Sequence, residues 1–533
     1  MSIKNRWHPR AITISGAVLL TMTLAACSGG ATGTGRGASD PAEAGRGGVF
    51  TAALSGDVMN LDTANCAPIV YCSVAYDTLT YLSPADGSIQ PSLATSWEWT
   101  DDTRTVLRLT LREGAEFEDG TPITGEAVAA SFTSYLTAPG PFAALSYPLV
   151  SAAAAGADQV DITFAEPLTD EFALYLLAGQ NGVGYIVSPA AAADRSLIAE
   201  DTAGSGPYML DTSETTKGVK YVYVRNPKYY DQEAIKYDKV VLQPMMDPSA
   251  RLNAIRSGQV SWAANIAPAD AAAVGDAGLT ASRGPLGSFA SLALLSRDSG
   301  PLADVRVRQA LAYATPRDDI ATALYGPDAV PTSSMIPEGA EGYSAANVNM
   351  YGYDQDKAKE LLAEAGYDDG FTITAFAPAF FDPGSTVGQS LKTAYAEIGV
   401  TLELVPFDGG PGEVAMQIGN YDAVIMSNGA NGLSQAVYTM LRPMGGLANP
   451  KNVPLDDELV TRLHAAATSA DPAEQKELVK EATARLDELV YVVPIASIPT
   501  IQAVNADVRN VPDEYWTIEA NPFSPAAAEA WQG

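Results

Sequence analysis

The chain has 533 residues and a formal net charge of −31, with 47% hydrophobic and 18% charged residues. This length is too great for one hydrophobic core and fits two or three domains. The carboxylates are dispersed along the chain, and so acidic a protein is not expected to bind nucleic acid or an anionic membrane surface. With only two histidines and three cysteines, neither a metal site nor a cofactor is expected.

The chain starts with a basic segment, an apolar or small run over residues 11–24, and Leu-Ala-Ala-Cys ending at Cys27. This order is typical of an export signal over residues 1–26. Its last four residues resemble the lipobox of bacterial lipoproteins, which implies a lipid on Cys27. The alternative is an ordinary cleavage site with a chance cysteine. Residues 27–48 are glycine-rich, and we expect a flexible tether that anchors the protein to the outer face of the cell membrane.

The other two cysteines, Cys66 and Cys72, bracket the segment CAPIVYC. An even pair in an exported protein predicts a local disulfide that holds this loop in shape. The histidine beyond the signal, His464, lies in a helical pattern and is expected at the surface or half-buried. The motifs HExxH, GxSxG and the phosphate-binding Walker loop are absent from the sequence, so an enzyme is not predicted.

Next along the chain, strand and helix patterns alternate. Residues 104–114 alternate apolar and polar side chains and predict a half-buried strand. Thr124 can cap a helix that places Val128 and Phe132 on one face. Residues 218–227, GVKYVYVRNP, predict a strand that ends before its proline.

The second half continues the alternation. Asp304 and Asp354 are natural helix caps. Thr315 is expected to cap the next helix, which begins at the following proline and ends near Gly326. Residues 487–505 give apolar, strand-like runs. Mixed elements over this length predict a multidomain α/β protein.

Several phrases in order resemble one family, the extracellular solute-binding proteins of ABC importers of the oligopeptide-binding type (family 5). They are YDTLTYLSPADGSIQPSLATSWEWTDDTRTVLRLTLREGAEFEDGTPITGEAVAASF, GSGPYML with VRNPKYY, RLNAIRSGQVSWA, PLADVRVRQALAYATPRDDI and YDQDKAKELLAEAGYDDGF. The resemblance extends over nearly the whole body of the chain.

The resemblance implies an α/β, periplasmic-binding-protein-like (class II) bilobed fold with a third, inserted domain. When the matching stretches are used to place the domains along the chain, the second lobe covers residues 301–499 and the insert covers residues 81–204. The first lobe is then assembled from three segments, which are 49–80, 205–300 and 500–533.

The family resemblance also implies a function. A solute that contacts both lobes would close the molecule about a hinge. The closed receptor would then deliver the solute to a permease and ATPase complex in the membrane. We expect a monomer without catalytic residues. Two alternatives of other classes are an exported hydrolase and a surface receptor that does not transport.

Four segments match the family's ligand cleft, and each supplies polar or aromatic candidates for solute contact. The candidates are Ile69, Tyr71, Trp262, Asn265, Ser288, Phe289, Ser291, Ser427, Asn428 and Asn431. For Tyr71 the alternative is packing between the first lobe and the insert, and for Trp262 it is packing in the protein core.

The fourth segment departs from the family pattern. Peptide-binding members usually carry a tryptophan and an aspartate there, and this chain has Met426 and Gly429. A buried ammonium group without its carboxylate costs several kcal/mol, so a free peptide N-terminus is not the obvious ligand unless Asp408, Glu413 or Asp422 replaces the aspartate. A peptide or peptide-like solute is predicted, with a small oligosaccharide or a chelated metal as alternatives.

Overall fold

The computed structural model describes residues 47–508, apart from 59, 67–68, 84–87, 140–145, 180–182, 268–269, 285–287, 379–385, 408–413, 415, 430–431, 434–435, 442–447 and 507. The predicted signal, Cys27 and most of the tether lie outside these residues. Within the described part, no helix combines the length and the apolar character that a membrane crossing requires.

The first sheet has seven strands in the order β12-β19-β11-β1-β10-β9-β8. Strand β1 runs parallel to its neighbours β10 and β11, so the carboxyl ends of these three strands meet at one edge. The remaining pairs are antiparallel. The strands are β1 (Val49–Leu54), β8 (Tyr208–Leu210), β9 (Tyr221–Arg225), β10 (Lys239–Pro244), β11 (Trp262–Ala263), β12 (Thr280–Arg283) and β19 (Ile501–Val504).

The second sheet has six strands in the order β14-β18-β13-β17-β15-β16. Strand β15 is parallel to β16 and β17, whereas β13 is antiparallel to both β17 and β18. The strands are β13 (Ser288–Leu294), β14 (Val330–Pro331), β15 (Phe371–Pro378), β16 (Val400–Phe407), β17 (Ala423–Gly429) and β18 (Val492–Ile498).

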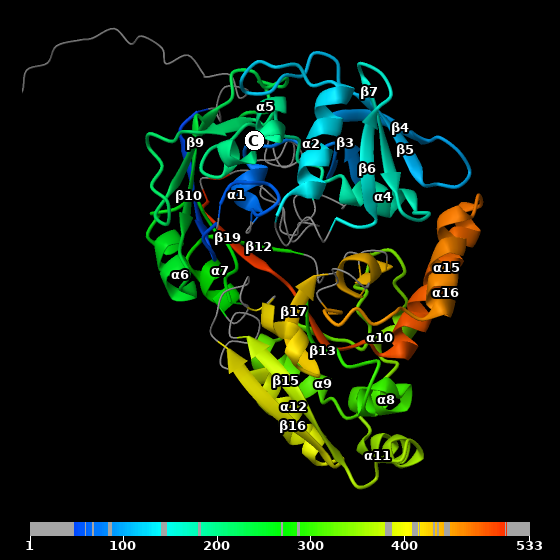
Figure 1. Cartoon of the computed structure of the whole chain (residues 1–533). Helices are drawn as coiled ribbons and strands as arrows, with labels where there is room; N and C mark the ends of the chain where they lie inside the picture. The colour runs from blue at the N-terminus through cyan, green and yellow to red at the C-terminus, as the bar shows by residue number, and fades with distance from the viewer. Residues whose placement is uncertain are drawn as a thin grey trace, which may run out of the picture. The chain divides into compact units, whose positions relative to one another are not determined.

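A separate four-stranded antiparallel sheet, in the order β4-β5-β7-β6, is inserted between β1 and β8 of the first sheet (Figure 1). Its strands are β4 (Ala94–Trp99), β5 (Val106–Leu111), β6 (Leu149–Ala154) and β7 (Gln159–Phe164), preceded by the hairpin of β2 (Thr80–Leu82) and β3 (Ile89–Pro91). The helices of this stretch are α1 (Val70–Ser73), α2 (Gly125–Thr137), α4 (Asp170–Leu176), α5 (Pro189–Ala193) and η2 (Arg195–Ile198).

The other helices follow in chain order. They are α6 (Pro248–Arg256), α7 (Ala271–Asp276), η4 (Pro301–Ala303), α8 (Val305–Tyr313), α9 (Arg317–Ile320), η5 (Ala321–Tyr325), α10 (Ala345–Val348), α11 (Gln355–Glu364), α12 (Thr386–Ala396), η7 (Ile418–Asn420), η8 (Ala436–Leu441), α15 (Asp457–Thr468) and α16 (Pro472–Leu489).

Two short connections join the large sheets. One leads from β12 to β13 and the other from β18 to β19. Arg283 pairs with Ile501 on one side of the crossing, and Ser288 pairs with Ile498 on the other. Between them, the amide of Gly284 donates a hydrogen bond 2.7 Å long to the carbonyl oxygen of Thr500. This paired crossing is the covalent link on which a hinge between the sheets would be built.

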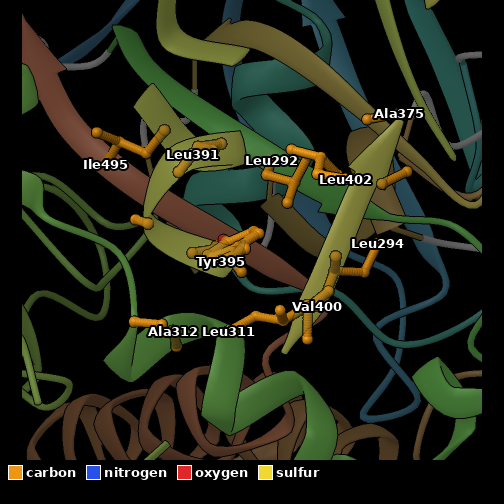
Figure 2. Packing of buried hydrophobic residues seen from close by; sticks show 14 of the residues in the cluster. Leu292, Leu294, Leu311, Ala312, Ala375, Leu391, Tyr395, Val400, Leu402 and Ile495 are labelled. Atoms are coloured by element: carbon orange, nitrogen blue, oxygen red, sulfur yellow. The ribbon is translucent and has the colours of Figure 1, made fainter. Parts of the chain in front are cut away.

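The second sheet is covered on one face by helices α8 and α12. Figure 2 shows Leu292 and Leu294 of β13 packing with Leu311 of α8 and with Leu391 and Tyr395 of α12. All five side chains are buried. Burial of large apolar side chains of this kind contributes about 1.5–3 kcal/mol each, so this layer holds the strands that carry two of the four candidate segments.

The local sequence signals are confirmed where they are strongest. Leu107, Leu109 and Leu111 are the buried face of β5. Thr124, Asp304 and Asp354 each accept a backbone hydrogen bond as helix N-caps.

Two expectations need correction. The Thr315 hydroxyl does not cap the next helix, because it donates back to the carbonyl oxygen of Leu311 at 2.8 Å. In addition, β13 (Ser288–Leu294) belongs to the second sheet, whereas the mapping by family phrases assigns residues up to 300 to the first lobe. The boundary between the sheets therefore falls at 284–287, since this crossing is the point where the chain changes its strand partners.

Candidate solute-binding site

The loop after β1, Ser55–Asp57, joins the first two candidate segments. The hydroxyl of Tyr71 donates to the carbonyl oxygen of Gly56 at 2.8 Å. The hydroxyl of Tyr221 donates to Asp57 Oδ1 at 2.9 Å. Burial, together with the nearby Asp57 carboxylate, raises the pKa of Tyr221 to about 12, so this hydroxyl stays protonated and acts as a donor at neutral pH.

The first candidate segment packs behind this loop. Cys66 and Cys72 are joined by a disulfide, the pairing expected for an even pair of cysteines in an exported protein. Tyr71 is fully buried and its ring meets that of Tyr221 edge-on at 4.9 Å. Ile69, at the start of α1, is half-buried against the same core. Tyr71 thus has the surroundings of a packing residue, and contact of either side chain with a solute stays a prediction.

The second candidate segment lies at the carboxyl edge of the first sheet. Trp262 is buried in β11 between Ala52 and Val504. Asn265 is exposed and has a positive φ of 48°, a left-handed conformation that asparagine tolerates better than most residues. Its Nδ2 donates to Ser55 Oγ at 2.8 Å. Its backbone amide donates to Gln502 Oε1 at 3.3 Å.

The guanidinium of Arg251 binds the backbone on either side of the Asn265 peptide group. This buried guanidinium donates to the carbonyl oxygens of Ala264 at 2.8 Å and Asn265 at 2.8 Å, after β11. It also donates to those of Met245 at 2.6 Å and Met246 at 3.0 Å, after β10. One side chain therefore ties together two strand ends of the edge that presents Asn265.

The third and fourth segments are neighbouring strands of the second sheet. Ser288 Oγ and Ser427 Oγ lie 3.2 Å apart, and both side chains are half-buried. Ser427 pairs with Ala290, so Ser288 and Ser427 share one face of the sheet. This hydroxyl pair sits at the end of β13 that emerges directly from the crossing between the sheets.

Phe289 and Ser291 point to the opposite face from Ser288, because side chains alternate along a strand. Both are buried, and the Ser291 hydroxyl donates to the carbonyl oxygen of Met426 at 3.4 Å. The backbone of Asn428 pairs with Phe289, whereas Asn431 lies outside the described residues. The structure therefore brings Ser288 and Ser427 together and separates them from Phe289 and Ser291.

Asp422, a possible replacement for the missing aspartate, has other partners. It accepts hydrogen bonds from Ser296 Oγ at 2.8 Å and from the amide and hydroxyl of Thr374 at 2.9 Å each. Burial alone would raise the pKa of Asp422, but these bonds and nearby Lys451 lower it below its usual value. Asp422 also precedes β17, at the opposite end from Ser427. Asp408 and Glu413 lie outside the described residues.

Sequence reasoning missed Ser55, Gln502 and Arg251. Ser55 directly follows the apolar strand β1 in the phrase LSGD, and small polar residues after a buried strand are a usable signal for the edge of a sheet. Gln502 and Arg251 carry no such signal, since their partners lie elsewhere in the fold: Gln502 is 237 residues from Asn265 along the chain.

Two α/β sheets joined by a paired crossing, with polar candidates on either side of it, define the class of two-lobed periplasmic binding proteins. The chain belongs to the bacterial extracellular solute-binding proteins of family 5: residues 88–452, more than half of its length, match the profile described as "Bacterial extracellular solute-binding proteins, family 5 Middle". The fold is the bilobed, class II fold of that family. The description of this family places its members outside the cytoplasm and defines them as solute-binding proteins.

Curated relatives include the glutathione-binding protein GsiB of Salmonella paratyphi A, which is 27% identical over 330 residues. That match spans 61% of this chain and 62% of the length of GsiB.

Two solved structures show the same fold. The periplasmic binding protein AgaA of A. tumefaciens R10, in complex with agropinic acid, has a TM-score of 0.76 and 24% identity, and the match covers 91% of this chain and 98% of AgaA. DppA of Helicobacter pylori, in complex with the peptide STSA, has a TM-score of 0.76 and 21% identity, with coverage of 90% and 98%.

Proposed function

We propose that the protein captures a peptide or peptide-like solute between its two lobes by hinge closure and delivers it to an ABC permease and ATPase complex. One observation carries this proposal: polar candidates from both sheets flank the same crossing. Gln502, which binds the amide of Asn265, directly follows Ile501 on one side. Ser288 pairs with Ile498 on the other side.

This placement of the polar groups would couple solute binding to closure of the two lobes. A solute that contacts only one sheet has no preference between open and closed forms, whereas a solute that bridges both sheets binds the closed form more tightly. The two polar groups lie within a few residues of the crossing. In this proposal the first lobe comprises residues 49–80, 205–284 and those from 500 onward, the insert 81–204, and the second lobe 288–499.

The chemistry of the candidates favours a solute recognised by hydroxyl and amide groups. Ser55, Asn265, Ser288 and Ser427 are uncharged, and the described carboxylate nearest in sequence to the fourth segment, Asp422, is held by its own partners. The relatives support a peptide-like or amino-acid-derived solute, since GsiB is named for glutathione and the two solved structures hold agropinic acid and a tetrapeptide. A small oligosaccharide and a chelated metal are the alternatives that the experiment separates.

Native mass spectrometry of the purified protein, followed by calorimetry, tests the solute class. The titrants are glutathione, the peptide Ser-Thr-Ser-Ala, agropinic acid, a cello-oligosaccharide and a histidine-chelated nickel ion. We expect one of the first three to bind, and Asn265→Gly to weaken that binding at least fivefold. The matched control is Asn253→Ala on the exposed surface of α6. Binding of the sugar or the chelate alone would overturn the peptide-like assignment.

We further propose that Cys27 carries the lipid that anchors the protein to the outer face of the membrane. The support is the sequence pattern before Cys27 and the glycine-rich residues 28–48. Cys27→Ser should release the protein from the membrane fraction into the medium, and intact-mass analysis should lose the acyl mass. Retention of the variant in the membrane would contradict the anchor without affecting the solute proposal. In the same proposal the protein acts as a monomer, which light scattering would check.

A further inference from the structure

Among the described residues, polar contacts join the loop between β7 and α4 of the inserted domain to the second lobe. His464 Nε2, on α15, lies 2.8 Å from Glu166 Oε2 in this loop. The hydroxyl of Thr169, the N-cap of α4, donates to Glu341 Oε1 at 3.3 Å. The partners are 298 and 172 residues apart in the chain.

These contacts are partly shielded from solvent. The side chain of Glu166 is 18% exposed and that of His464 is 40% exposed, while Thr169 is buried. An isolated side-chain pair at this level of exposure stabilises a protein only weakly. The significance of these contacts therefore lies in what they connect. The inserted domain and the second lobe are joined along the chain through residues of the first lobe, so these contacts form a second connection between them.

Glu341 extends this contact to the fourth candidate segment. It forms an isolated parallel bridge with Gly432, and the amide of Leu433 donates to its carbonyl oxygen at 2.9 Å. A Cβ placed on Gly432 would lie 2.9 Å from the Cβ of Glu341, so the two backbones are in close contact. The residue that meets the insert is thereby tied to the chain just after Asn428 and Asn431.

We propose that Glu166 and Thr169 of the insert, with His464 and Glu341 of the second lobe, form an interlobe latch that stabilises the closed form and raises solute affinity without contacting the solute. The inference rests on the proposed hinge closure. The latch lies between the insert and the second lobe, whereas the hinge lies at the crossing between the two large sheets.

Cross-linking tests whether the latch contact exists and whether it depends on closure. The variant Glu166→Cys with His464→Cys is treated with a short bismaleimide, first as purified and then after its solute is removed by unfolding and refolding. We expect a 166–464 link whose yield falls severalfold when the solute is removed. The matched control is Arg462→Cys with Glu481→Cys, which replaces a 2.9 Å pair within the second lobe and should link equally in both samples. Absence of the 166–464 link, or an unchanged yield, overturns the latch.

Solution scattering and calorimetry separate this inference from the proposed function. In ligand-free protein, His464→Ala should increase the radius of gyration, and it should weaken binding of whichever of glutathione or Ser-Thr-Ser-Ala binds by about two- to fivefold, the range for one partly exposed pair. Lys357→Ala, which removes an exposed pair within α11, should do neither. Unchanged scattering and affinity in His464→Ala overturn the latch while the receptor function stands. A larger radius with neither probe bound supports the latch and counts against the peptide-like solute.

Discussion

The hydroxyl of Tyr71 donates a 2.8 Å hydrogen bond to the carbonyl oxygen of Gly56, and this bond connects the disulfide-closed loop to the loop after β1. Burial, reinforced by the charge of Asp57, raises the pKa of Tyr71 far above its ordinary value. The side chain is therefore a permanent donor. It supports the strand edge where Ser55 meets Asn265.

Tyr71→Phe should lower the free energy of unfolding by about 1–2 kcal/mol, because the substitution removes the donor and leaves a half-buried carbonyl oxygen without it. Urea unfolding measures the loss. Tyr353→Phe is the control, since Tyr353 is 54% exposed and should change stability by less than about 0.5 kcal/mol. Equal stability of Tyr71→Phe and the wild type would show that Gly56 does not depend on this bond.

Asn265 allows backbone and side-chain effects to be separated. Asn265→Gly keeps the left-handed backbone at φ 48° and removes only the side chain. It should leave the free energy of unfolding within about 1 kcal/mol of wild type while weakening solute binding. Asn265→Ala should cost about 1 kcal/mol more than the glycine variant, because alanine is strained at positive φ. Thermal unfolding with calorimetry on both variants checks this, and a more stable alanine variant would contradict it.

The sequence predicted the features whose causes are local. Asp304 and Asp354 are caps because each carboxylate binds an amide two or three residues ahead. The buried face of β5 could be read because that strand is polar on its other face. In these segments neighbouring residues carry the whole signal.

The contacts that build the site are not local and could not be predicted. Asn265 and Ser55 are 210 residues apart, and nothing in either segment indicates the other. Strand β13 is buried on nearly its whole length, so it shows no polar alternation, and the sequence could not reveal which face of the sheet carries Ser288 and which carries Phe289. Family resemblance located the segments, and the register of β13 with β17 decided which side chains lie together.

Asp77 predicts a pH dependence of stability. Its carboxylate is 2% exposed, and neither oxygen has a hydrogen bond of good geometry within the described residues. Burial raises its pKa to about 8, against the opposing effects of the Tyr230 hydroxyl and the charge of Arg112. The folded protein thus keeps a proton that the unfolded chain releases near pH 4, so this group lowers stability as the pH rises from about 4 to 8.

Asp77→Asn removes this proton uptake and should therefore gain stability relative to wild type as the pH rises. We expect the difference in free energy of unfolding between variant and wild type to shift by about 1–3 kcal/mol in favour of the variant between pH 5 and pH 8, since one unit corresponds to about 1.4 kcal/mol. Urea unfolding at both values measures it. Asp276→Asn, at the exposed end of α7, is the control, and a difference that does not depend on pH would contradict the prediction.

Arg251 gives the most direct test of the first-sheet edge. Its guanidinium supplies donors to four carbonyl oxygens at the ends of β10 and β11. A lysine in its place has a single nitrogen, which cannot reach both strand ends in the same fork geometry. Arg251→Lys should therefore lower the free energy of unfolding by about 2–3 kcal/mol, the cost of leaving buried carbonyl groups unpaired.

The same substitution should also affect the presentation of Asn265, because its carbonyl oxygen accepts one of the lost bonds. In calorimetry at a temperature where the variant remains folded, solute affinity should fall with Arg251→Lys. Arg256→Lys, on the exposed side of the same helix, should change neither quantity. If Arg251→Lys lost stability but bound its solute as tightly as wild type, the edge would be structural, and Asn265 would have to be removed from the proposed binding site.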